Sequence, residues 1–246
     1  MTIAGVFDDN EAGYRGGAIY NDGDLDANEK GAVMTINGAT FTDNEAGDSG
    51  GAIYNTGKLV INGGLFEDNE SGVWAGAIYN SGSTDKKDLF MKDTEQRQTA
   101  GDLTIKDAIF RNNKAALAGA LAAGTSAQNT YIENTVFEGN EADEIGAVGL
   151  FSSATLNNVK FINNHAKETT VAYNIDGAGA LFLGSNSATD VRGVLTGSVF
   201  DSNTSGINGG AIATRTFVQG DNRQATLDIT GTMFKNNIAG TVGGAF

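Results

Sequence analysis

The stretch from Phe41 to Asn55 reads FTDNEAGDSGGAIYN, and it contains two motifs that recur along the whole chain. The first motif is Phe-x-x-Asn, and the second is Gly-Ala followed by an apolar residue, usually seven residues after that Asn. Each motif occurs eight times. The Phe-x-x-Asn pairs are Phe7 and Asn10, Phe41 and Asn44, Phe66 and Asn69, Phe110 and Asn113, Phe137 and Asn140, Phe161 and Asn164, Phe200 and Asn203, and Phe234 and Asn237. Such self-similarity predicts a solenoid of stacked units with one continuous core.

The spacing of the motifs predicts the kind of solenoid. Successive Phe residues of the motif lie 24 to 44 residues apart. A minimal coil of about 24 residues, made of short strands and bends, favours an all-β parallel β-helix over a helix-containing leucine-rich repeat. In seven of the eight units an Ile or Leu lies five residues before the Phe, so we expect a strand that ends in this aliphatic residue, a bend at Phe-x-x-Asn and a second strand at Gly-Ala. The sequence thus predicts about eight coils in a single β-helix domain over residues 1–246.

The two motif residues predict a structural ladder inside the coils. The Phe rings are expected to stack as an aromatic column. The Asn side chains can both donate to and accept from the identical amide one coil away. Asn also tolerates the left-handed backbone conformation, so we expect the ladder Asn itself to form the bend.

Composition limits the partners. The net charge of −14 makes nucleic acid and anionic membrane surfaces poor partners. The chain has no Pro, as expected of strands paired on both sides, and no Cys, so stability must come from the core. It has no long apolar run and no start that resembles a signal peptide. We therefore expect no direct membrane insertion by this segment.

The ends of the sequence raise a further expectation. The chain opens almost directly on a repeat and stops at Gly-Gly-Ala-Phe246, without a visible polar cap. Terminal coils of a solenoid normally need caps, because they expose unpaired strand edges. We therefore expect either a fragment of a longer surface protein or end-to-end self-association into a structural fibre.

The alternation of Phe-x-x-Asn with Gly-Gly-Ala-Ile resembles the repeat of the polymorphic outer-membrane protein family of bacterial autotransporter passengers. The resemblance covers nearly the whole chain, and both halves of the motif recur together. It implies a right-handed parallel β-helix that is secreted to the cell surface and commonly used in adhesion. The implied partner is a protein or glycan on a host cell or a neighbouring cell.

Insertions between coils are the first candidates for recognition, because function in a repeat protein often lies in what departs from the repeat. Five insertions fall between the Gly-Ala strand and the following strand, which ends in the Ile or Leu before the next Phe. We therefore expect their loops to project from one edge. The insertions are Asp22 to Ala32, Ser81 to Ala100, Ala122 to Asn129, Gly184 to Gly193 and Thr214 to Gln224. A sixth, Lys167 to Asp176, lies at the other junction. The longest holds four candidate binding residues, Lys86, Lys87, Phe90 and Arg97; a solvated insertion pinned by Phe90 is the alternative.

Three further features are candidate sites. Asp22, Asp24 and Asp26 form an oxygen-rich cluster that could hold Ca²⁺, with a plain acidic turn as the alternative. Apart from this ion, no cofactor is expected. Tyr20, Tyr54 and Tyr79 each follow an Ile, so if Ile points inward the rings stack outside, where they could seat a sugar chain or simply cover the sheet. Trp74 is a candidate exposed anchor.

Some parallel β-helices are carbohydrate-active lyases or hydrolases, so an enzymatic function is one alternative for this chain. His165, the single His, follows a ladder Asn and is expected to be a solvated turn residue. Hydrolysis by paired carboxylates needs two acids that face each other across a groove, whereas the bend of a Phe-x-x-Asn motif already accounts for the adjacent Asp8 and Asp9. The sequence therefore favours a non-catalytic adhesin passenger, with a carbohydrate-binding or carbohydrate-active β-helix as the alternative and a self-stacking fibre as the third.

Overall fold

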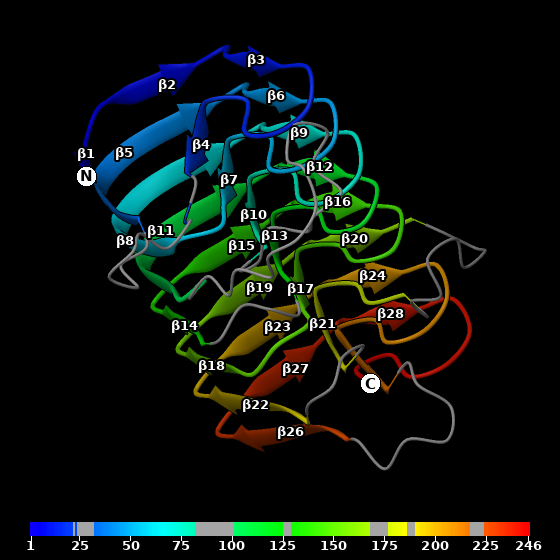
Figure 1. The fold of residues 1–246 in the computed structure, drawn as a ribbon. Helices are drawn as coiled ribbons and strands as arrows, with labels where there is room; N and C mark the ends of the chain where they lie inside the picture. Colours follow the sequence, from blue (N-terminus) through cyan, green and yellow to red (C-terminus); the bar gives the residue numbers. More distant parts are fainter. Residues whose placement is uncertain are drawn as a thin grey trace, which may run out of the picture.

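The structure of the protein is a computed structural model that describes residues 1–21, 23, 32–81, 101–124, 129–167, 177–185, 190–216 and 224–246. These residues form strands, turns and bends, and the strands pair in parallel from one coil to the next (Figure 1). The chain is therefore a parallel β-helix, as predicted. No helix in the described ranges is long and apolar enough to cross a membrane.

The described strands belong to three sheets. The large sheet has 13 strands: β1 (Thr2–Ile3), β2 (Val6–Asp8), β5 (Val33–Thr42), β8 (Lys58–Glu67), β11 (Leu103–Arg111), β14 (Thr130–Glu133), β15 (Val136–Glu138), β18 (Ala154–Asn157), β19 (Lys160–Ile162), β22 (Val191–Thr196), β23 (Val199–Asp201), β26 (Ala225–Thr230) and β27 (Met233–Lys235). The Gly-Ala sheet, named after the motif that precedes its strands, has seven: β4 (Ile19–Asn21), β7 (Ile53–Asn55), β10 (Ile78–Asn80), β13 (Leu121–Ala123), β17 (Val148–Leu150), β21 (Leu181–Ser185) and β25 (Ile212–Thr216).

The third sheet, the short-strand sheet, has eight strands of two residues each: β3 (Glu11–Ala12), β6 (Glu45–Ala46), β9 (Glu70–Ser71), β12 (Lys114–Ala115), β16 (Glu141–Ala142), β20 (His165–Ala166), β24 (Thr204–Ser205) and β28 (Ile238–Ala239). It was not expected from the sequence, which predicted two strands per unit. Each of these strands follows a ladder Asn directly, so the chain re-pairs as soon as it has turned the corner.

The Phe of the motif lies in a strand rather than in the bend. In β5, β8 and β11 it shares one continuous strand with the aliphatic residue five positions earlier, for example Ile61 and Phe66 in β8. The bend comes later, at the residue before the ladder Asn. That residue has a positive φ of 54° at Asp68 and 54° at Asn112. The expectation that the ladder Asn takes the left-handed conformation is therefore wrong: a short polar neighbour or Gly139 turns the backbone, which leaves the Asn side chain free to point inward.

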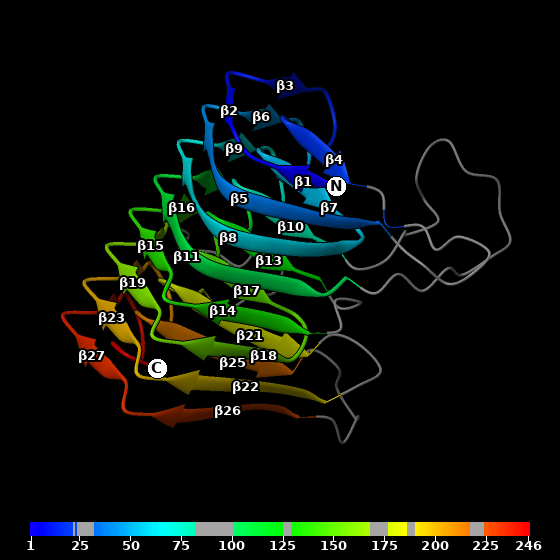
Figure 2. The same cartoon turned by 90° about the vertical axis from the view of Figure 1, so that its left-hand side faces the viewer.

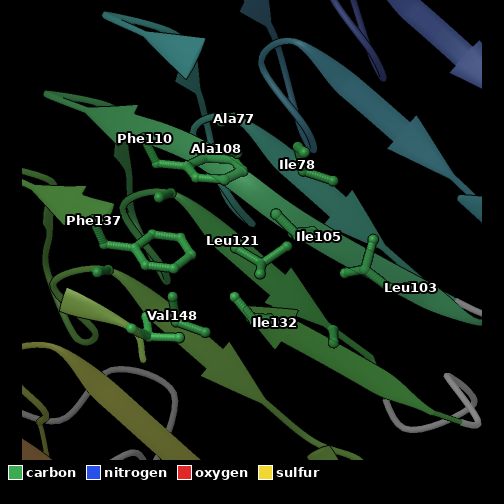
Figure 3. Packing of buried hydrophobic residues seen from close by; sticks show 14 of the residues in the cluster. Ala77, Ile78, Leu103, Ile105, Ala108, Phe110, Leu121, Ile132, Phe137 and Val148 are labelled. Carbon is green, nitrogen blue, oxygen red and sulfur yellow. The ribbon is translucent and has the colours of Figure 1, made fainter. Parts of the chain in front are cut away.

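The core lies between the sheets and runs along the solenoid. Ile61, Phe66 and Ile78 are fully buried, and inward residues of successive coils repeat this arrangement. Figure 3 shows Phe110 and Phe137 from the large sheet pointing into the same interior as Leu121 and Val148 from the Gly-Ala sheet. The eight motif Phe rings stack with centroids 4.5–5.2 Å apart and interplanar angles of 5–16°.

The Gly of the Gly-Ala motif lets adjacent coils approach each other. A Cβ built on Gly119 would lie 2.2 Å from the carbonyl oxygen of Gly146, and one on Gly51 would lie 2.1 Å from that of Gly76. Both obstacles are backbone atoms, which cannot rotate away. Any side chain at this position would separate the coils, so the motif requires Gly here because of packing.

One edge carries the roots of the predicted loops. The strands of the Gly-Ala sheet end beside one another, with Asn21, Asn55 and Asn80 in register, and the chain then enters β5, β8 and β11, which Figure 2 shows stacked in the large sheet. The five insertions expected at this corner leave and rejoin the β-helix there. Their central residues lie outside the described residues.

Candidate functional site

The eight Asn residues of the motif form a continuous hydrogen-bonded column inside the β-helix. In a typical step, Nδ2 of Asn113 donates to Oδ1 of Asn140 at 2.9 Å and to the carbonyl oxygen of Phe66 at 2.9 Å. The backbone N–H of Asn113 donates to the same Oδ1 at 3.0 Å. The inner members of the column, such as Asn113 and Asn140, are fully buried. The column thus gives the Asn side chain of each bend hydrogen-bond partners in neighbouring coils and holds consecutive coils together.

A second Asn column, which the sequence analysis missed, holds the corner from which the insertions leave. Nδ2 of Asn21 donates to Oδ1 of Asn55, and Nδ2 of Asn55 donates to Oδ1 of Asn80, each at 2.5 Å. Asn55 also donates to the carbonyl oxygen of Gly57, and Asn80 to that of Gly101. All three Asn residues are buried. The signal is present in the sequence as an Asn directly after each of the three Ile-Tyr pairs.

The three Tyr residues point away from the core, and their exposure differs. Tyr20 and Tyr54 stack with centroids 5.2 Å apart and rings 2° from parallel, whereas Tyr54 and Tyr79 are tilted by 47°. Tyr20 is 48% exposed, but Tyr54 is only 3% exposed. The prediction of three exposed stacked rings is therefore wrong: Arg15 covers the ring of Tyr54 with Cζ 4.6 Å from the centroid, and the ring of Tyr79 is half-buried and tilted.

Trp74 is half-buried rather than a free anchor. Its ring lies 5.3 Å from that of Tyr79 and 6.1 Å, edge to face, from that of Phe151. These rings belong to a second apolar cluster on the outer side of the Gly-Ala sheet, together with Leu117 and Ile145. The cluster forms where the column of outward rings gives way to Ala122 and Gly149, whose small size leaves room for it. The main role of Trp74 is thus packing.

The exposed rings of this aromatic surface lie in the first coil. Tyr14, which the sequence analysis did not single out, is 54% exposed, and the guanidinium of Arg15 lies 4.6 Å from its centroid. The same guanidinium covers Tyr54, and its Nε lies 3.8 Å from a carboxylate oxygen of Asp48. Tyr14, Arg15, Tyr20 and Tyr54 form what we call the Tyr-Arg cluster. Flat rings with a fixed cation between them can contact a ligand that has both apolar and hydrogen-bonding faces.

Other predicted site residues lie outside the described residues. These are the candidate Ca²⁺ ligands Asp22, Asp24 and Asp26 and the candidate binding residues Lys86, Lys87, Phe90 and Arg97. Within the described ranges, no group of three or more His, Asp or Glu side chains is arranged to hold a metal ion.

The residues weighed for catalysis have structural surroundings. His165 is half-buried in β20, where its Nδ1 lies 2.5 Å from Oγ1 of Thr204, so the expectation of a solvated turn residue is wrong. Asp8 ends β2 and accepts a hydrogen bond from the Thr42 hydroxyl, whereas Asp9 takes the left-handed conformation of the bend. The two adjacent carboxylates therefore belong to successive positions of the corner and do not face each other across a groove.

Ion pairs between coils shift the pKa values of three surface side chains, Lys106, Glu133 and Asp201. A hydrogen bond from Lys106 at 3.1 Å, aided by its charge, lowers the pKa of Glu133, and the same contact raises the pKa of Lys106. A hydrogen bond from Lys235, with others from Ser202 and Asn236, lowers the pKa of Asp201. In both places a carboxylate is held in its charged form, as is usual for structural pairs.

Comparison with known protein families finds one repeat in three places. The Chlamydia polymorphic membrane protein repeat matches residues 5–22, 38–56 and 197–215. Each matched segment contains a Phe-x-x-Asn pair and the following Gly-Ala motif. No curated protein and no solved structure matches the chain. The chain therefore carries repeats of the Chlamydia polymorphic membrane protein type, and it builds them into a parallel β-helix.

Proposed function

We propose that this chain is a surface-displayed segment of a bacterial cell-surface protein that binds a host cell or a neighbouring cell and catalyses no reaction. The similarity to a membrane protein repeat supports a location at the cell surface. The partner in this proposal is a protein or a glycan of the opposing surface. Contact is made by outward side chains and by the insertions rooted at one corner, whereas the coils hold these groups in place.

The observation that carries the proposal is the direction in which the motif residues point. The Phe and Asn residues of the inner coils are buried. Each Phe ring stacks on the equivalent ring one coil away, and each Asn side chain is hydrogen-bonded to the equivalent Asn. Outward positions of the same strands differ from coil to coil, as with Thr42, Glu67 and Arg111, which lie in register. The repeat thus serves the scaffold, and the variable surface is left for recognition.

A cell-adhesion assay tests the proposal. Beads coated with the purified chain should bind cultured epithelial cells more than beads coated with an unrelated acidic protein, and soluble chain should compete. Treating the cells with a protease or with glycosidases separates a protein partner from a glycan. The proposal fails if folded chain gives no binding above the control, or if it cleaves polysaccharides with release of new chain ends.

A carbohydrate-binding role is the second candidate, and the Tyr-Arg cluster favours it. Tyr14 and Tyr20 present partly exposed rings of the size that packs against a sugar, and the guanidinium of Arg15 lies 4.6 Å from the centroid of the Tyr14 ring. If this role is correct, the double change Tyr14→Ala and Tyr20→Ala abolishes the glycosidase-sensitive part of bead binding. The matched change Tyr131→Ala, on the large sheet, leaves that part intact.

A further inference from the structure

One outward column of the large sheet is largely apolar. Its residues alternate with the buried Phe column and lie in register from coil to coil: Val6, Thr40, Leu65, Ile109, Val136, Lys160, Val199 and Met233. We call this column the outer stripe. Val6 is 72% exposed, Ile109 36% and Met233 56%. The strands that carry it lie one below the next in Figure 1, so the stripe runs along the solenoid and across the strands.

A dense group of carboxylates lies beside the first half of the outer stripe. It occupies the corner that follows the Phe in three successive coils and is called the acidic corner here: Asp8, Asp9, Glu11, Asp43, Glu45, Glu67, Asp68 and Glu70. Seven of these residues are exposed and Glu67 is half-buried. The next coil has basic residues at two of these positions. Arg111 forms an ion pair with Glu67 at 3.1 Å, and Lys114 lies beside Glu70 in the short-strand sheet.

The acidic corner places like charges next to one another. Glu11, Glu45 and Glu70 are direct neighbours in the short-strand sheet, where adjacent strands lie about 4.8 Å apart. Like charges directly opposite each other in a sheet are destabilising. The coils keep this arrangement although neither the Phe column nor the Asn column requires acids at these positions. A cationic partner would relieve the repulsion.

We propose that the outer stripe and the acidic corner together bind a basic amphipathic helix of a partner protein. The inference rests on the proposed binding function and names the class of partner. An apolar row of a helix repeats every 5.4 Å, close to the spacing of about 4.8 Å between coils, so a helix laid along the stripe contacts several coils in succession. Its Lys and Arg residues on one flank then face the acidic corner. A partner strand fits less well, because strands add to a sheet through free backbone groups, and the inner strands that carry the stripe are already paired with a neighbour on each side.

The test uses the full chain and a synthetic probe. The probe is a peptide with Leu at helical positions i, i+3, i+4 and i+7 and Lys elsewhere. Two control peptides have the same Leu and Lys residues in scattered order, or Glu in place of Lys. Fluorescence anisotropy at several salt concentrations measures the dissociation constants. We expect the ordered basic peptide to bind more tightly than both controls, with an affinity that falls as salt rises.

Variants locate the binding surface. Neutralising the corner with Asp43→Asn, Glu45→Gln and Glu70→Gln should weaken binding by about tenfold and flatten its salt dependence. The matched control removes three carboxylates elsewhere, with Asp107→Asn, Asp143→Asn and Asp190→Asn, and should leave the affinity within about twofold of the wild-type value. Equal losses in both variants would overturn the proposal, because binding would then follow net charge alone.

The stripe is tested separately. The changes Leu65→Thr, Ile109→Thr and Val136→Thr keep β-branched or strand-compatible side chains on the surface, and circular dichroism checks that the variant folds. This variant should weaken binding of the ordered peptide without changing its salt dependence. Three results would overturn the proposal: unchanged affinity in the stripe variant, preferential binding of heparin, or dimerisation of the chain through the stripe. If peptide binding fails while coated beads still adhere, only this inference falls; if both fail, the proposed function falls as well.

Discussion

At the residue scale, each motif position serves a contact between coils. Phe supplies a ring for the stacked column, Asn supplies an amide that donates twice and accepts twice, and Gly leaves space for the next backbone. These demands recur with every coil, which is why the motif recurs in the sequence. Outward positions face no such demand, and several of them vary, as with Asp8, Thr42, Glu67 and Arg111, which lie in register.

The Asn column provides a sharp test of this view. Replacing Asn113 with Ala removes the side-chain partner of the Phe66 carbonyl oxygen and of the backbone and side-chain donors of Asn69, and it removes one of the two donors to Oδ1 of Asn140. We expect the free energy of unfolding to fall by at least about 2 kcal/mol, measured by urea denaturation. The control Asn62→Ala removes a comparable bond to Asn37 on the exposed face and should cost less than about 0.5 kcal/mol. Similar losses in both variants would contradict the role given to the inner column.

The Gly column provides an independent test. Gly119→Ala puts a methyl group 2.2 Å from the carbonyl oxygen of Gly146, so the two coils must separate locally. We expect a loss of about 3 kcal/mol in the free energy of unfolding. Gly13→Ala is the matched control, since nothing lies within 4 Å of a Cβ at Gly13. A Gly119→Ala protein as stable as the control would show that close approach of the coils does not explain the motif.

At the scale of elements, the sequence predicted the strands that carry a long motif and missed those that do not. The Phe and Gly-Ala strands follow from residues repeated at fixed spacing. The short-strand sheet has only two residues per strand, such as Glu70–Ser71, which is too short for any alternation to be read. Burial of Tyr54 by Arg15 also escaped prediction, because it depends on how the segment before the Gly-Ala motif, where Arg15 pairs with Ser49, is placed against the sheet.

Pairs of adjacent strands set the local response to pH. The Lys235 ammonium of β27 lies 2.8 Å from Asp201 of β23 and lowers the pKa of that carboxyl from its ordinary value of 3.8. A lowered pKa in the folded state contributes stability above the ordinary value, and this contribution is lost as the pH falls through the folded-state pKa. Lys235→Met should therefore raise the pKa of Asp201, as followed by NMR titration of its carboxyl carbon. An unchanged pKa would assign the shift to Ser202 and Asn236 instead.

At the scale of the whole molecule, each coil contacts mainly the coils on either side. The free energy of unfolding is therefore close to a sum of the stabilities of single coils and of the interfaces between neighbouring coils. Asn203→Ala removes column bonds to Phe161 and Asn237, several coils away from Trp74. We expect circular dichroism of this variant to begin to fall at a lower urea concentration than the fluorescence of Trp74, the single Trp. If circular dichroism and Trp74 fluorescence of the variant changed at the same urea concentration, the solenoid would unfold as one cooperative unit, and this would contradict independent unfolding of distant coils.

The central claim is that the repeated motif faces inward and builds the scaffold of the β-helix. Native-state hydrogen exchange, read by NMR or by mass spectrometry of peptides, tests it most directly. The backbone N–H groups of Asn44, Asn69, Asn113, Asn140 and Asn164 donate to buried side chains of the next coil at 3.0–3.1 Å. The account predicts that they exchange among the slowest amides of the chain. Rapid exchange at these positions in the folded protein would place the motif on the surface and contradict the account.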